Sequence, residues 1–516
     1  MIQEYPYVDS DSVHVHTEHT DEKTVVPAEE KKQRRAWTTN EKFIFRAVFI
    51  FVIVYSVPTD TGWYAKIFTI DYAHLNYRHL TSIIAFFNPH FINHYSESGF
   101  FGLYSYVNLL LVSVVAVVGA IIWSVLDKKS RDYDVLYYWA RVAARYRIAY
   151  GVIAWGYKKV FVMQMPFPSE GLLNTEFINF FAKRLYWESL GIVPSYEVFL
   201  GFAEFIPGIL LLFRKTTALG AALTVVVLGN VAIANHAYDI GEQVPSFSLS
   251  LLAFFVLWYY LPTIWNLLVN EKDSQVVTFV PTFESKWQIY LKRSIQYTGN
   301  FIFVFLFGAF EIYAYTHNDF YKIPNTPGLT GAKGYYQVTE FKRNNKVVPY
   351  SPLDSIRWQD VSFEEFSSMS FRVANRPQQI QMFAAGSYPR FGEEYDYKWK
   401  FHPKGDERRY GTGEDKFDPE KRDININWEF SGLGSERHWY YYKADTINHI
   451  LYLQHKNKHT RNLKQVLHYS RPTKSRIILS GTNEFNDSIY VVLDKQNKQY
   501  PAINRYDRSG EINYTY

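Results

Sequence analysis

The sequence lacks cysteine altogether, and this absence removes several kinds of chemistry at once. None of its 516 residues is cysteine, so disulfide bonds, thiolate nucleophiles, iron–sulfur clusters and cysteine-type zinc sites are excluded. A strong charge of one sign is also absent, because the net charge is only +5 and the basic residues are scattered. No continuous basic stripe is present, which argues against a nucleic-acid partner.

Local catalytic motifs are missing as well. The sequence contains no Gly-rich phosphate loop, nucleophile elbow, zinc signature or internal repeat. His90 and His94 are four residues apart, a spacing that on a helix lets two histidines share a metal or a haem. No acidic third ligand is near them in the sequence, so we expect no metal site.

Long apolar runs are the main feature that is present. The mean hydropathy of −0.20 averages two unlike parts, an apolar one from Phe43 to Thr316 and a polar, aromatic-rich one that follows. About 20 apolar residues cross a bilayer as a helix. Seven runs are predicted to do so: Phe43–Val57, Tyr104–Leu126, Ile148–Met165, Glu197–Phe213, Thr217–His236, Phe247–Val269 and Thr298–Thr316. Thr59–Phe100 and Asn174–Ser189 mix aromatic and charged residues, as do helices that lie in the membrane interface.

The distribution of basic residues predicts the orientation. Residues 1–42 are polar and are expected to form a disordered tail. This tail and the loops 127–147, 214–215 and 270–294 carry most of the lysine and arginine, and with seven spans all four lie on one side. Because basic loops stay in the cytoplasm, we expect a cytoplasmic N-terminus and a periplasmic C-terminal domain in a bacterial inner membrane.

From Gly334 onward the pattern changes to a period of two, which is typical of half-buried strands. After a linker over residues 317–333, residues 334–516 are predicted to form an all-β antiparallel barrel or sandwich. The four tryptophans Trp358, Trp399, Trp428 and Trp439 suit a barrel core, and a lipocalin-like ligand pocket is the alternative. The predicted strands are Tyr335–Phe341, Ser355–Phe363, Ser370–Val373, Tyr395–Phe401, Ile424–Phe430, Trp439–Tyr442, Ile450–Gln454, Arg476–Ser480 and Ser488–Leu493.

Polar residues from separate spans fall at a similar predicted depth. A charge at the middle of a bilayer costs about 2.5–3.5 kcal/mol on insertion scales, so such groups are rare without partners. The predicted topology brings several of them to the outer third of the helical domain 43–316, which favours one outward-facing polar cavity where a lysine pairs with Glu204. The candidate proton-exchanging residues are Lys158, Lys159 and Glu204, and the candidate cavity residues are Asn108, Trp155, Asn230, Asn235, His236, Asp239 and Glu311.

Each of these residues also has a purely structural interpretation. Lysines near the end of a span reach the headgroups with their ammonium groups. Glu204 can hold helices together by hydrogen bonding. His236 and Glu311, close to span ends, suit capping or interfacial positions. The agreement in depth therefore carries the cavity hypothesis.

Three stretches resemble the DoxX-like membrane proteins, in their long bacterial form. These are RIAYGVIAWGYKK from Arg147 to Lys159, GFAEFIPGILLLFRKTTALGAA from Gly201 to Ala222, and NVAIANHAYDIGEQVPSFSL from Asn230 to Leu249. The resemblance covers roughly residues 43–270 and implies a link to the small subunit of thiosulfate:quinone oxidoreductase and to membrane redox complexes. The long outer domain departs from that family, and the missing cysteine removes any thiol relay. A helical bundle followed by a β-rich domain also looks distantly like the vitamin K-dependent carboxylases, although no local motif allows catalytic residues to be carried across.

Two functions from different classes follow. In the first, the chain is a quinone-linked or lipid-linked redox component of the inner membrane, with membrane lipids and a protein partner around it. In the second, the helices anchor a lipocalin-like periplasmic domain that binds a lipid or a protein partner without catalysis, and an envelope scaffold is a variant of this idea.

Overall fold

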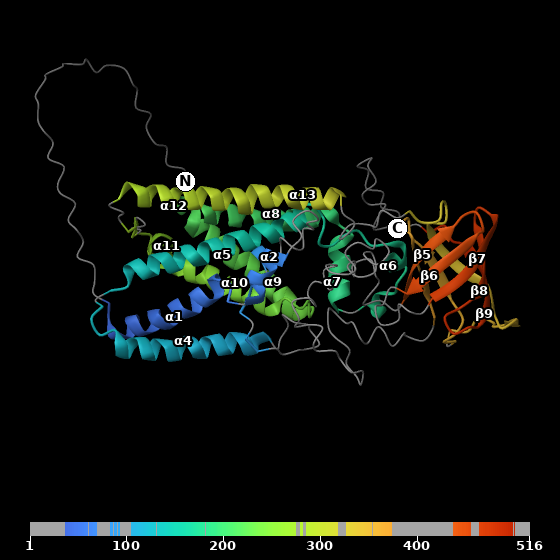
Figure 1. Ribbon diagram of the computed structural model, residues 1–516, viewed down its shortest axis with the longest axis horizontal. Helices are drawn as coiled ribbons and strands as arrows, with labels where there is room; N and C mark the ends of the chain where they lie inside the picture. The colour runs from blue at the N-terminus through green and yellow to red at the C-terminus, as the bar shows by residue number, and fades with distance from the viewer. Residues whose placement is uncertain are drawn as a thin grey trace, which may run out of the picture.

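The computed structural model joins an elongated helical bundle to a β-barrel that lies beyond one end of it (Figure 1). The structure describes residues 37–59, 61–69, 83–85, 87–89, 91–92, 105–130, 132–180, 182–274, 279–281, 285–317, 327–352, 354–373, 437–455, 464–498 and 500. The tail up to residue 36, His90, His94, and the predicted strands Tyr395–Phe401 and Ile424–Phe430 lie outside the described residues.

Helix α5, Asp134–Val160, is the central helix of the bundle. It packs against α1 (Thr39–Ser56), α8 (Pro194–Leu212), α10 (Gln243–Trp258) and α13 (Phe307–His317). Small residues on α5 are fully buried, among them Ala140, Ala144, Ala149 and Ala154, and they let its neighbours approach closely. The remaining long helices are α4 (Tyr106–Leu126), α9 (Thr217–Ala237) and α12 (Lys286–Asn300), which a π-helical turn over Phe301–Leu306 joins to α13.

Every predicted span is helical, but the count of seven crossings is not confirmed. Within the described residues, α4, α8, α9 and the α12–α13 helix are long and apolar enough to cross a membrane. The pair α10 and α11 (Leu261–Leu268), bent by 67°, makes a fifth if the two form one broken span. Helices α1 and α5 fall short of this test because each carries several charged residues, such as Arg46 on α1 and Arg141, Arg145 and Arg147 on α5.

The shorter helices differ in part from their predicted bounds. The basic stretch 134–147, expected as a loop or a separate amphipathic helix, is continuous with the third predicted span in α5. The predicted interfacial helix over 174–189 is a short 3-10 turn, Phe177–Asn179, followed by α7, Ala182–Gly191. In the other predicted interfacial region, α2 (Thr61–Thr69) leaves Phe68 86% exposed. An apolar side chain as open as this suits contact with lipid.

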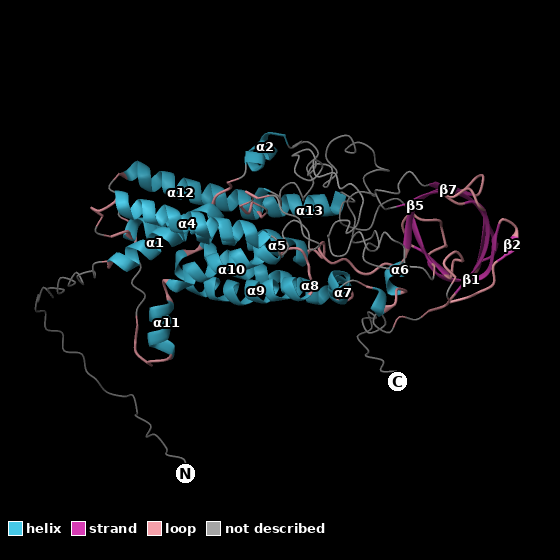
Figure 2. Cartoon of the chain, turned by 90° about the horizontal axis from the view of Figure 1, so that it is seen from below, coloured by secondary structure: helices cyan, strands magenta, loops and turns pink. Residues whose placement is uncertain are grey.

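The C-terminal domain is a closed antiparallel barrel and not a sandwich (Figure 2). Closure follows from the pairing of β1 (Gly334–Arg343) with β9 (Ser488–Lys495). Between them run β3 (Asp360–Phe363), β4 (Ser368–Arg372), β5 (His438–Asp445), β6 (Ile450–His455), β7 (Lys464–Thr473) and β8 (Arg476–Thr482), each hydrogen-bonded to the next. The short β2 (Lys346–Val347) extends β1 in a hairpin whose turn places Asn344 and Asn345 at positive φ.

The barrel interior is filled by side chains. Inward-facing residues alternate along each strand and include Tyr336, Phe341, Phe363, Tyr440 and Tyr442, each at most 2% exposed. The predicted linker contributes to this domain, because Leu329 packs into the core and its N–H donates to the Tyr442 hydroxyl at 2.7 Å. A packed interior is what an eight-stranded barrel allows, so the described part of the barrel favours a side-chain core over a lipocalin-like pocket.

A polar seam connects the barrel to the bundle. The one-turn helix α6, Glu170–Leu173, lies against β1, β3 and β4, and the Glu364 carboxylate accepts hydrogen bonds from the N–H groups of Glu170 and Gly171 at 2.8 and 2.9 Å. Next to it, Asp360 pairs with Arg437 at 2.6 Å and with Arg372 at 2.8 Å. The barrel face toward the bundle is therefore fixed by charged and hydrogen-bonded contacts.

Candidate functional site

A buried ion pair lies between α5 and α8 near the end of the bundle that faces the barrel. The Lys159 ammonium donates to both carboxylate oxygens of Glu204, at 2.9 and 2.8 Å. The side chains are only 9% and 5% exposed. A buried charge without a partner is strongly unfavourable, so the two groups hold each other in the ionised form.

The close approach of two backbones makes this pair possible. A Cβ added at Gly156 on α5 would meet the Phe205 N atom at 3.0 Å, and one added at Gly201 on α8 would meet the Val160 N atom at 2.6 Å. Only glycine fits at both positions, and the ridge that it leaves open lets α8 lie directly on α5. Lys159 and Glu204 are therefore held at a separation that larger residues would prevent.

Lys158 belongs to the same cluster but has a different contact. It is 3% exposed, and its ammonium lies 4.4 Å from the centre of the Trp155 ring, one turn earlier on α5. Lys159 reaches the same ring at 5.7 Å. The indole thus lies within reach of both ammonium groups and contributes a cation–π attraction of about 0.5–2 kcal/mol to each.

Glu197 is a second buried acid on α8, and we did not single it out in the sequence. It is fully buried, and its Oε1 atom accepts hydrogen bonds from the backbone N–H groups of Gln164 and Met165 at 3.2 and 2.9 Å. Glu197 and Glu204 are seven residues apart, about two helical turns, so they share one face of α8. That spacing was the available signal, which we missed because Glu197 stands at the start of the predicted span.

Other predicted cavity residues form local hydrogen bonds at separate places. Asn108 on α4 binds the backbone of residues 91 and 92, with distances of 2.8 Å. Asn235 donates to the Glu242 carbonyl and the Ser246 hydroxyl, and the Asp239 carboxylate accepts from Gln243 at 2.9 Å. The imidazole of His236 forms a 2.8 Å hydrogen bond with the Tyr106 hydroxyl. These contacts fix the α9–α10 turn and the start of α4.

The last two predicted residues lie apart from the ion pair. Glu311 is fully buried on α13, a helix that packs on α5. Asn230 is exposed on the outer surface of α9. The structure therefore brings together Lys158, Lys159, Trp155 and Glu204, adds Glu197, and leaves Asn230 outside this acid–base cluster.

Comparison with known proteins gives little to add. No family model matches the chain, and no solved structure matches it. A 72-residue stretch, 14% of this chain, is 36% identical to the uncharacterized protein YwoB of Bacillus subtilis strain 168 and covers 47% of that protein. The alignment thus spans about half of the relative's length.

Proposed function

We propose that the chain is an integral membrane protein whose acid–base cluster, Lys158, Lys159, Glu197 and Glu204, exchanges protons with a lipid-soluble substrate. The observation that carries this proposal is the two-pronged contact of Lys159 with Glu204 inside a bundle of apolar helices. Ionisable residues buried at membrane depth mark substrate or proton pathways more often than they serve packing alone. In the proposed orientation this cluster and the barrel share the periplasmic side.

A quinone is the substrate class that suits these groups. An ammonium donates to a quinone carbonyl, a carboxylate receives a proton from a quinol hydroxyl, and an indole offers a flat apolar wall. Reduction of a quinone to a quinol takes two electrons and two protons. The protons would pass through the Lys159–Glu204 pair and the electrons would come from a redox protein bound beside the chain. The DoxX-like resemblance implies the same substrate class and remains a prediction.

The proposal is tested with two matched variants of the full-length chain. Glu204→Gln keeps the shape and a hydrogen bond to Lys159 but cannot carry a proton, and the double variant Lys159→Met/Glu204→Met removes both charges together. We expect quinone to co-purify with the wild-type protein and infrared difference spectra of quinone reduction to show a carboxyl band that Glu204→Gln removes. Wild-type protein that contains no quinone, or an unchanged spectrum in Glu204→Gln, would contradict the proposal.

A second function is favoured by the polar seam between α6 and the barrel. Ion pairs and helix capping hold the barrel at a fixed place on the bundle, as a membrane anchor for a partner-binding domain requires. If this function is the main one, both cluster variants retain full activity in cells that lack the native protein. Substitutions on the exposed barrel surface, such as Tyr452→Ser on β6, then abolish it.

A further inference from the structure

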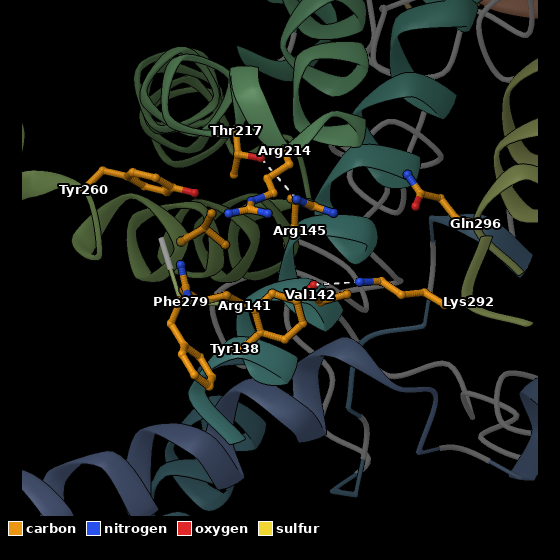
Figure 3. Close-up of a pocket in the computed structure, with 11 residues that line it drawn as sticks. Tyr138, Arg141, Val142, Arg145, Arg214, Thr217, Tyr260, Phe279, Lys292 and Gln296 are labelled. Carbon is orange, nitrogen blue, oxygen red and sulfur yellow. Dashed lines mark hydrogen bonds between the residues drawn. The ribbon is translucent and has the colours of Figure 1, made fainter. Parts of the chain in front are cut away.

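A pocket lies among α5, the α8–α9 turn, α10 and α12, on the N-terminal half of α5 (Figure 3). Its volume is about 110 Å³, well above the ~10–15 Å³ that one water needs and below the ~300–1,000 Å³ of sites for drug-sized ligands. The pocket therefore suits a small polar group and not a large molecule.

Its lining is strongly basic. Arg141 and Arg145 come from α5, Arg214 from the turn between α8 and α9, and Lys292 from α12. Among the residues that the structure describes, no carboxylate lines the pocket. Cations from three separate segments thus surround a small space, and their mutual repulsion is relieved only by an anion inside it.

Arg141 provides independent support. It is 92% buried and rests on the Tyr259 ring at 3.5 Å, but its guanidinium forms no hydrogen bond or ion pair with any described residue, and its Nε atom is buried. Arg145 has one hydrogen bond, from its Nη1 atom to the Thr217 hydroxyl at 3.2 Å, and its Nε atom is also buried without a partner. Buried guanidinium donors of this kind call for an acceptor with several oxygens.

We propose that this pocket binds a phosphate group. A phosphate offers several acceptor oxygens and one or two negative charges, which match the planar donors of two arginines and the point charge of a lysine. Neutral donors are at hand in Tyr138 and Gln296. The Tyr138 hydroxyl already meets the Lys292 ammonium at 3.3 Å, so the two walls of the pocket are in contact.

The position of the pocket favours a phospholipid headgroup as the source. Arg141 and Lys159 are 18 residues apart on α5, about 27 Å along the helix, close to the ~30 Å thickness of a hydrocarbon core. Exposed aromatic side chains, which favour headgroup level, lie around this end of the bundle on α5, α10, α11 and α12: Trp139, Trp258, Trp265, Trp287 and Tyr290. In the proposed orientation the pocket faces the cytoplasmic leaflet, where anionic lipids are concentrated.

The full-length chain is tested in nanodiscs of phosphatidylcholine with or without phosphatidylglycerol, and retained lipid is counted by native mass spectrometry. We expect retention of phosphatidylglycerol and at least tenfold weaker retention in Arg141→Gln/Arg145→Gln. The matched control, Lys128→Gln/Lys129→Gln, removes the same charge from exposed positions after α4 and should stay within twofold of wild type.

A second arm distinguishes the sources of phosphate. Inorganic phosphate is added to lipid-depleted protein in neutral detergent, and its binding is measured by calorimetry. Binding that the arginine variant loses supports a soluble phosphate ligand, and retention of lipid alone supports a headgroup. Equal losses in the pocket and control variants, or equal retention of both lipids by wild type, would overturn the proposal. If the arginine variant fails to fold, Lys292→Gln replaces it on the opposite wall.

Discussion

The two ends of the bundle treat buried positive charge in opposite ways. Toward the barrel, Lys159 has a carboxylate within 2.9 Å. At the far end, Arg141 is 8% exposed and rests on aromatic rings, with no ion pair among the described residues. Both residues belong to the single helix α5, so the difference comes from the helices packed around them.

This contrast indicates different purposes. A charge that the chain itself neutralises is complete without a ligand, and its function, if any, depends on moving a proton within the pair. A buried arginine without a counter-ion raises the energy of the ligand-free protein, so binding of an anion is favoured. The barrel repeats the first pattern, because Arg437 and Asp360 pair at 2.6 Å beneath its outer face.

The largest expected effect is at the paired end. Lys159→Ala leaves Glu204 buried without a counter-ion and should lower the free energy of unfolding by about 3–5 kcal/mol. Lys159→Met/Glu204→Met removes both charges and should recover most of that loss. Denaturant unfolding of the purified chain, followed by tryptophan fluorescence, measures both. A double variant as unstable as the single one would show that the charges are not coupled.

The unpaired end gives the matched comparison for this experiment. Arg141→Met removes a buried cation that has no carboxylate partner among the described residues, so no opposite charge is stranded. Only the cation–π contact with Tyr259 is lost, about 0.5–2 kcal/mol. If Arg141→Met destabilises the chain as much as Lys159→Ala does, the contrast between the two ends is wrong.

A second prediction separates the two ends by geometry. Gly201→Ala places a Cβ 2.6 Å from the backbone N of Val160, where nothing flexible can move aside. We expect α8 to shift away from α5, with a loss of about 1–3 kcal/mol in stability and of any activity that depends on Lys159. Phosphate-group binding at the other end should be unchanged. Gly229→Ala on α9 is the control, because nothing lies within 4 Å of the added Cβ.

A third prediction extends the comparison to the barrel through pH. Burial, and secondarily the charge of Arg437, lowers the pKa of His438 to about 4. Its ring stacks on Phe371 at 5.0 Å and keeps part of its surface in solvent. The folded state therefore binds fewer protons than the unfolded state, in which the imidazole pKa is about 6.5. The stabilising effect of the neutral ring is complete above pH ~6.5 and is lost as the pH falls toward ~4.

We expect a loss of about 1–2 kcal/mol over that range, less than the full shift implies because the solvent-facing part of the ring is screened. Thermal unfolding from pH 7 to pH 4 measures it. His438→Phe should flatten this part of the pH profile, while His468→Gln, an exposed position on β7, should leave it as in wild type. An unchanged slope in His438→Phe would assign the effect to other groups.

The sequence predicted the elements better than their contacts. Period-two runs located the barrel strands except β7 and the short β2, and the agreement in depth predicted a lysine paired with Glu204. Sequence alone could not choose between Lys158 and Lys159, because neighbouring helix positions point about 100° apart and only the place of α8 decides between them. The pairing of β1 with β9, which separates a barrel from a sandwich, connects residues too far apart for local patterns to reveal.

The phosphate pocket was hidden for a similar reason. Arg141, Arg145 and Arg147 were read as a basic loop that sets orientation, which is a statement about charge and not about shape. Two further features needed the folded chain: the continuation of α5 through this stretch, and the approach of Arg214 and Lys292 from segments about 70 and 150 residues later.

The smallest expected effect concerns the seam between barrel and bundle. Glu364 accepts hydrogen bonds from the N–H groups of Glu170 and Gly171, while its neighbour Glu365 is 74% exposed and pairs only with Lys333 in the solvent. Glu364→Gln loses the charge at the start of α6, a loss of about 1 kcal/mol, so these two amides should exchange hydrogen roughly fivefold faster. Glu365→Gln should leave their exchange unchanged, because a surface ion pair contributes about 0–1 kcal/mol and does not reach α6. Equal exchange rates in the two variants would mean that the barrel is held on the bundle by apolar packing, such as that of Trp439 against Gly171, and that paired charge matters only inside the helices.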